Sequence, residues 1–136
     1  MKLSLFFISG GISGAITDPD SDKAKKHAEL FYEEIRKRTY DYCEQIALNT
    51  GYDVALIKQI KNYLFYDCHL LENNEIKRFD PNFYIAQSWN RLSSKNKNVI
   101  DSHDLFLIKH ELYESQLLQS GKLNQHDAHI QASKNI

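Results

Sequence analysis

The sequence predicts an all-α protein: one compact domain of about five helices, with a long first helix and a short last helix that folds back on the fourth. Apolar residues recur mainly at steps of three and four, which is the spacing of one helix face. The chain contains only two prolines and five glycines, so few residues would break a helix. The chain has 136 residues, of which 42% are apolar, and this is enough to form one hydrophobic core without disulfides. We expect an N-terminal loop or extended segment over residues 1–20 and a single all-α domain over 21–136.

The first helix is expected from Asp22 to about Asn49, after a cap provided by Asp18, Asp20 or Ser21. Its apolar stripe consists of Ala24, Ala28, Phe31, Ile35, Tyr42 and Ile46. Gly51 then ends this helix.

Four further helices follow, and a loop over residues 66–80 separates the second helix from the third. Asp53 caps the second helix, whose stripe is Val54, Ile57, Ile60, Lys61 and Leu64. Asp80 followed by Pro81 predicts the start of the third, because proline suits the first helical turn. Ser102 caps the fourth, which runs from about Asp104 to Ser120 before Gly121, and Asn124 caps the short last helix.

Charge and hydropathy exclude some classes of protein. Seventeen basic and eighteen acidic residues give a net charge of -1, without the strong positive charge typical of nucleic-acid binders. No segment is long enough to cross a membrane, and the apolar run Leu3–Ile8 is shorter than the core of a secretory signal. That run packs on the domain or is a remnant of the expression vector. We expect a soluble protein with two reduced cysteines, Cys43 and Cys68.

The stretch KHELYE on the fourth helix carries the main candidate chemistry. His110 and Glu114 are four residues apart and share a stripe with Leu107 and Leu118, so we expect them to be partly buried. A buried carboxylate needs a metal, an arginine or a hydrogen-bond donor. The pair therefore predicts either a divalent metal site or a structural His–Glu hydrogen bond, and Glu111 is a further catalytic candidate.

The last helix offers His126 and His129 on one face. If it folds back on the fourth helix, His129 approaches His110 and Glu114. Such a group suits zinc or manganese, or a general acid–base cluster. On the third helix, Trp89 is expected as a core anchor, and Arg91 either pairs with a carboxylate such as Glu114 or binds a substrate phosphate.

Several segments together resemble a family of small domains. In order they are SGAITDPDSDKAKKHAELFYEEIRKR, IKNYLFYD, RFDPNFYIAQSWNRL, HDLFLIKHELYE and DAHIQAS, from Ile12 almost to the end of the chain. They resemble the C-terminal toxin or effector domains of phage minor head (MuF-type) proteins and of bacterial polymorphic toxins. The most specific elements are SW-x-R-L, H-E-x-x-E and A-H.

The resemblance implies an effector in the cytoplasm of a producing or target bacterium, or a virion-associated protein. An immunity protein or a phage structural protein would be its partner. The polar set that it carries over is His27, Arg36, Asp67, Trp89, Arg91, Asp104, His110, Glu111, Glu114 and His129. Such domains usually continue past the A-H helix into an aromatic segment. If that segment completes the site or the core, this copy is expected to be truncated, inactive or repurposed.

Two functions remain open at this stage. One is a hydrolase, with a nuclease preferred to a peptidase, in which His110, Glu114 and His129 form the centre and Arg91 binds substrate. The other is a non-enzymatic phage accessory or protein-interaction module, in which the same residues form a buried polar network. Convergence of the three side chains beside an open cleft favours the enzyme.

Overall fold

The computed structural model describes residues 18, 20–38, 40–71, 73–119 and 125–134, so most of the expected N-terminal segment lies outside them. The all-α prediction is confirmed: these residues form six α-helices, two other short helical turns and one small hairpin. In chain order the elements are α3 (Asp22–Lys37), α4 (Asp41–Thr50), α5 (Val54–Lys61), the π-helical turn η1 (Asn62–Tyr66), β1 (His69–Leu70), β2 (Ile76–Lys77), α6 (Phe83–Leu92), the 3-10 turn η2 (Lys97–Val99), α7 (Ser102–Gln119) and α8 (Gln125–Lys134).

The single long helix expected over 22–49 is wrong, because α3 ends at Lys37 and α4 begins at Asp41. The last turn of α3 contains Arg36 and Lys37, cations that suit the negative end of a helix. The break allows α4 to contact both α5 and α6, with Cys43 and Ile46 completely buried. Tertiary packing therefore overrides a stripe that would also fit one straight helix.

Side-chain caps define several helix starts. Ser21 caps α3 as predicted, because its hydroxyl accepts a hydrogen bond from the Ala24 backbone N–H at 3.1 Å. Asp53 occupies the N-cap position of α5, although its side chain makes no capping hydrogen bond. The start of α6 lies later than the Asp–Pro pair indicated, because Asn82 is the residue that caps it.

The cap of α7 is Asp101 rather than the expected Ser102. The Asp104 N–H donates to Asp101 Oδ1, and the Asp101 N–H donates to Asp104 Oδ2, both at 3.1 Å. This reciprocal pair is a capping box built from two aspartates. The expected end of this helix at Ser120 and Gly121, and the cap at Asn124, lie outside the described residues.

The loop expected over residues 66–80 contains a two-stranded antiparallel hairpin, β1 with β2. Asn74 turns it with φ 64°, in the left-handed region that asparagine tolerates better than most residues. Strands of two residues leave too little alternation for the sequence to predict them.

The core lies where α3, α5, η1 and α6 meet. Trp89 of α6 is buried there as predicted, with its ring edge-on to Phe65 at 5.2 Å between centroids. Phe65 in turn meets the Tyr32 ring of α3 at 4.8 Å. These aromatic contacts hold together α3, η1 and α6, which form the platform on which α7 lies.

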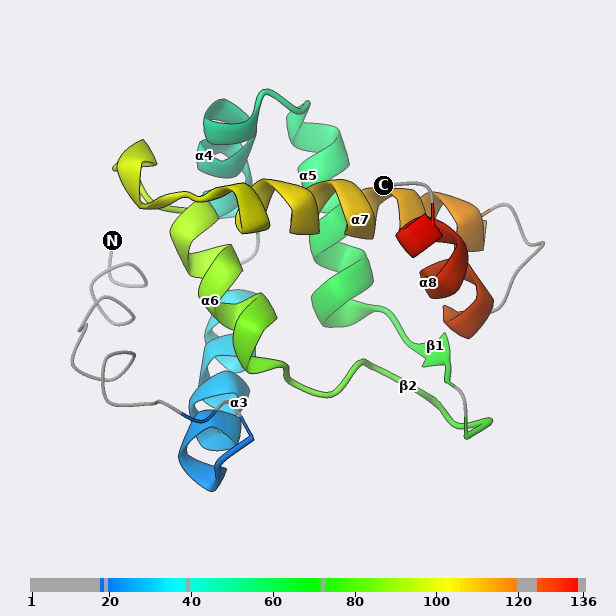
Figure 1. Cartoon of the computed structure of the whole chain (residues 1–136). Coiled ribbons are helices and arrows are strands. Elements are labelled where there is room, and N and C mark those ends of the chain that lie inside the picture. Colours follow the sequence, from blue (N-terminus) through cyan, green and yellow to red (C-terminus); the bar gives the residue numbers. More distant parts are fainter. Residues whose placement is uncertain (1–17, 19, 39, 72, 120–124, 135–136) are drawn as a thin grey trace.

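Figure 1 shows α7 crossing this platform and α8, in red, folded back against the C-terminal half of α7. The predicted return of the last helix onto the preceding one is therefore confirmed.

Within the described ranges, no helix combines the length and the apolar character needed to cross a membrane.

A partly buried ion pair joins α6 to the start of α7. Arg91 Nε and Nη2 donate to the two oxygens of Asp104 at 2.8 and 2.7 Å, and the Ser88 hydroxyl donates to Asp104 Oδ1 at 2.6 Å. Burial opposes ionisation of Asp104, but the hydrogen bonds from Arg91, Ser88 and the backbone outweigh it, so the pKa of Asp104 lies below its ordinary value. The Asp104 carboxylate thus stabilises the start of α7 and holds α6 against it.

We expect Asp104→Asn to lower the free energy of unfolding by about 2 kcal/mol, less than for a fully buried pair because Arg91 is one-third exposed. The pKa of Asp104 is lowered on folding, so its contribution is complete above its ordinary value of 3.8 and is lost as pH falls through the lower folded value. Urea titrations of wild type and variant at pH 7 and pH 3 measure this.

Asp80→Asn is the control, because Asp80 also pairs with a cation, Lys77, but is exposed. Its cost should stay below about 0.5 kcal/mol. Equal losses in the two variants at pH 7 would contradict a stabilising role for the Arg91–Asp104 pair.

Candidate metal centre

Helix α7 buries three acids beside the core residue Ile108 and exposes two large apolar side chains near its start. Asp104, Glu111 and Glu114 are 0%, 7% and 2% exposed, whereas Leu105 and Phe106 are 45% and 49% exposed. Burying carboxylates costs free energy unless they have partners, while exposing Leu105 and Phe106 forgoes hydrophobic stabilisation. The arrangement is therefore typical of a site rather than of a helix selected for packing alone.

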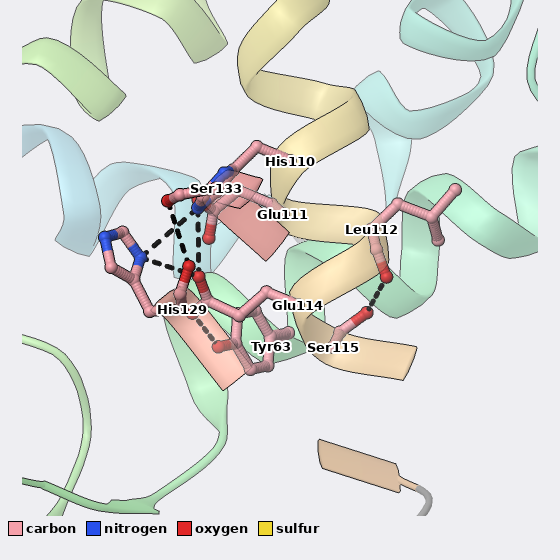
Figure 2. Close-up of polar contacts among 8 residues, drawn as sticks. All are labelled: Tyr63, His110, Glu111, Leu112, Glu114, Ser115, His129 and Ser133. Atoms are coloured by element: carbon pink, nitrogen blue, oxygen red, sulfur yellow. Dashed lines mark hydrogen bonds and ion pairs between the residues drawn. The ribbon is translucent and has the colours of Figure 1, made fainter. Parts of the chain in front are cut away.

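Three side chains converge on one point between α7 and α8 (Figure 2). His110 Nε2 lies 3.1 Å from Glu114 Oε2, and His129 Nδ1 lies 2.9 Å from the same oxygen. The two histidine nitrogens are 3.2 Å apart. The sequence-based expectation that His129 approaches His110 and Glu114 is thus confirmed.

When Glu114 is ionised, hydrogen bonding alone leaves one of these three contacts unfavourable. Glu114 Oε2 can accept protons from both His110 Nε2 and His129 Nδ1. Both nitrogens are then donors, so their mutual contact at 3.2 Å is repulsive. A cation at the centre of the triangle would instead accept a lone pair from all three atoms.

The spacing and the ligand types match those of a zinc site. Ligand atoms about 2.0–2.2 Å from a tetrahedral zinc ion lie roughly 3.4 Å from one another, so these three atoms need to separate by only a few tenths of an ångström. Two histidines and one glutamate form a ligand set that catalytic zinc sites use, with the fourth position left open. The side chain of His129 is 55% exposed, so the open fourth coordination position would be accessible to solvent.

Glu111 adds a second buried carboxyl group beside the cluster. Its Oε2 lies 3.8 Å from His110 Nε2. Burial, reinforced by the charge of Glu114, raises the pKa of Glu111 to about 8. The hydrogen bond to Glu114 in turn raises the pKa of His110 above its usual value.

Tyr63 of η1 completes the surroundings of Glu114. Its hydroxyl donates to Glu114 Oε1, the oxygen that does not face the histidines. An outer hydrogen bond of this kind orients a ligand and fixes which oxygen faces the ion. The sequence alone does not indicate Tyr63 as a site residue, because it lies 51 residues from Glu114 and only the packing of η1 near α7 brings the two together.

Two hollows flank the cluster. One, of about 480 Å³, lies between α6 and α7 and includes both Arg91 and His110 in its lining. The other, of about 730 Å³, includes Tyr63 and Asp67. The suggested pairing of Arg91 with Glu114 is wrong, because α6 and the start of α7 place Asp104 against Arg91 instead.

The remaining polar candidates lie apart from the cluster. His27 is buried on α3 and contacts Gln87 of α6 at 3.0 Å, and burial lowers its pKa. Arg36 donates to the Phe65 carbonyl at 2.6 Å, and Trp89 belongs to the core. These three have structural roles here, and the side chain of His126 lies outside the described residues.

No family model, curated protein or solved structure matches this chain. The chemistry of the cluster therefore has to follow from its own geometry.

Replacing Tyr63 with phenylalanine should destabilise the fold by about 1.5 kcal/mol, because it removes a hydrogen bond to a buried carboxylate. Chemical denaturation of the metal-free protein measures the loss. Tyr84→Phe is the matched control, since Tyr84 is 65% exposed and should change stability by less than about 0.5 kcal/mol. A loss no larger than that of the control would show that Glu114 does not depend on this hydroxyl.

Proposed function

We propose that the protein is a divalent-metal hydrolase whose ion, zinc in preference to manganese, is bound by His110, Glu114 and His129. The observation that carries this proposal is the triangle of donor atoms, each within 3.2 Å of the other two. Two nitrogens and one oxygen suit zinc, whereas manganese prefers a larger share of oxygen ligands.

Such an ion would act as a Lewis acid that polarises a carbonyl or phosphoryl group. It would also lower the pKa of water, so that hydroxide is available as the nucleophile at neutral pH. The chain would supply the remaining functions. Tyr63 holds Glu114 from behind, and the exposed His129 leaves one side of the cluster open to a substrate.

Glu111 is the group proposed to move a proton. It follows His110 directly in the chain, and its carboxyl oxygen lies 3.8 Å from His110 Nε2, beside the three residues that would hold the ion but not one of them. The positive charge of a bound ion would favour the ionised form of Glu111, and this carboxylate could then take a proton from the attacking water and pass it to the leaving group.

The biological setting is proposed from the resemblance to effector domains of phage minor head proteins and polymorphic toxins. A hydrolase in that setting acts in the cytoplasm of a target bacterium and is neutralised by an immunity protein in its producer. The convergence of the three side chains beside a hollow supports an enzyme more than an accessory module.

One observation favours the non-enzymatic alternative, an interaction module with a structural network. Tyr63, His110 and His129 all contact Glu114, so a protonated histidine could compensate its charge without an ion. This alternative predicts that no metal binds with useful affinity.

Zinc binding separates the two functions directly. We expect the wild type to bind one zinc ion per chain in isothermal titration calorimetry, and His129→Ala to weaken binding at least about tenfold. His129 is exposed, so the variant should still fold. His103→Ala changes an exposed histidine on α7 that is not part of the cluster, and this variant should bind zinc as the wild type does. No zinc uptake by the folded wild type would leave only the structural network.

Turnover is tested with Glu111→Gln. We expect the variant to bind zinc like the wild type and to lose hydrolysis by a factor of about 10² or more, because proton transfer contributes that much. Rates on mixed peptide and oligonucleotide substrates measure the effect. Unchanged rates in the variant would remove Glu111 from the mechanism.

The effector setting is tested by inducible expression in bacteria. The wild type should arrest growth, and His129→Ala should not, with folding of the variant checked by circular dichroism. Equal growth of both strains would argue against a toxic activity of this chain.

A further inference from the structure

We propose that the substrate is a peptide, and that the hollow between α6 and α7 binds a bulky apolar side chain next to the bond that is cleaved. This inference rests on the proposed hydrolase function and names its substrate class. It starts from the hollow of about 480 Å³ that reaches His110, one of the three donor residues. Its volume lies within the roughly 300–1,000 Å³ of small-molecule sites.

The lining of the hollow is mainly apolar. Tyr84 and Ile85 of α6 face it from one side, and Phe106 and Leu107 of α7 face it from the other. Tyr84 is 65% exposed, so this apolar surface is open to a ligand. An aromatic or aliphatic side chain entering here would remove apolar area from water on both partners.

The charge of the hollow argues against a phosphate backbone. Its arginine, Arg91, is held by two hydrogen bonds to Asp104, and its charge is balanced by that carboxylate. A polyanion needs several uncompensated cations, since each bound phosphate is neutralised by lysine or arginine. The net charge of -1 offers no compensating field.

The position of His110 links binding to cleavage. This side chain both lines the hollow and points its Nε2 at Glu114 Oε2. A side chain seated between Phe106 and Leu107 would therefore hold its own backbone amide beside the three donors. Hydrolysis would then add water across that amide: the carbon–nitrogen bond breaks, the carbonyl carbon gains the hydroxyl group, the nitrogen gains the proton, and a carboxylic acid and an amine are released.

The test uses the zinc-loaded full chain and pairs of fluorogenic peptides that carry phenylalanine or serine at one position, beside single-stranded RNA and DNA. We expect hydrolysis of the phenylalanine peptide, and a kcat/KM for it that falls at least about tenfold in Phe106→Ser. Leu105→Ser is the matched control: Leu105 is equally exposed and precedes Phe106, but does not line the hollow. Its kcat/KM should match that of the wild type.

Binding provides a readout that does not need turnover. Zinc-loaded Glu111→Gln should bind the phenylalanine peptide at least about tenfold more tightly than the serine peptide in calorimetry, and a second change, Phe106→Ser, should remove this preference. Equal affinities for the two peptides, or equal effects of Phe106→Ser and Leu105→Ser, would overturn the subsite.

The outcomes separate this inference from the function on which it rests. Zinc uptake with cleavage of RNA or DNA and not of peptides would keep the hydrolase and overturn the peptide substrate. Zinc uptake without cleavage of any substrate would overturn the hydrolase, and absence of zinc uptake would overturn both.

Discussion

Glu114 is an almost fully buried carboxylate, and the helices around it must supply the groups that tolerate its charge. Helix α5 continues into η1, which brings Tyr63 to one oxygen, and α8 folds back to bring His129 to the other. His110, one turn earlier on α7, completes the set. Because an isolated buried charge is far costlier than any single surface contact, this requirement constrains how α7 and its neighbours pack.

Helix α7 shows what that requirement costs. Its inward positions carry Asp104, Glu111 and Glu114, while Leu105 and Phe106 remain in contact with water. At its start the cost is offset by the Arg91–Asp104 pair, which also joins α6 to α7. Further along, the proposed ion would offset the charge of Glu114. The stability forgone at Phe106 leaves an apolar surface beside His110, where the proposed peptide side chain binds.

The two halves of α7 thus have related roles. The first half, with its ion pair and its exposed apolar residues, forms one wall of the hollow. Further along the helix lie His110 and Glu114, two of the three donor residues. A rigid helix spaces the two at a fixed distance, which is an advantage for a site that must bind a substrate and polarise a neighbouring bond.

The sequence by itself determined the all-α class, the Ser21 cap, the end of α4 at Gly51 and the pairing of His110 with Glu114, because each depends on residues within one helical turn or on one helix face. It also predicted that the last helix returns to α7. Only the tertiary structure decided that the long first helix breaks before α4, that Arg91 pairs with Asp104 rather than Glu114, and that Tyr63 reaches Glu114. These outcomes depend on which helices pack together, and the free energy of that packing comes from contacts between residues far apart in the chain.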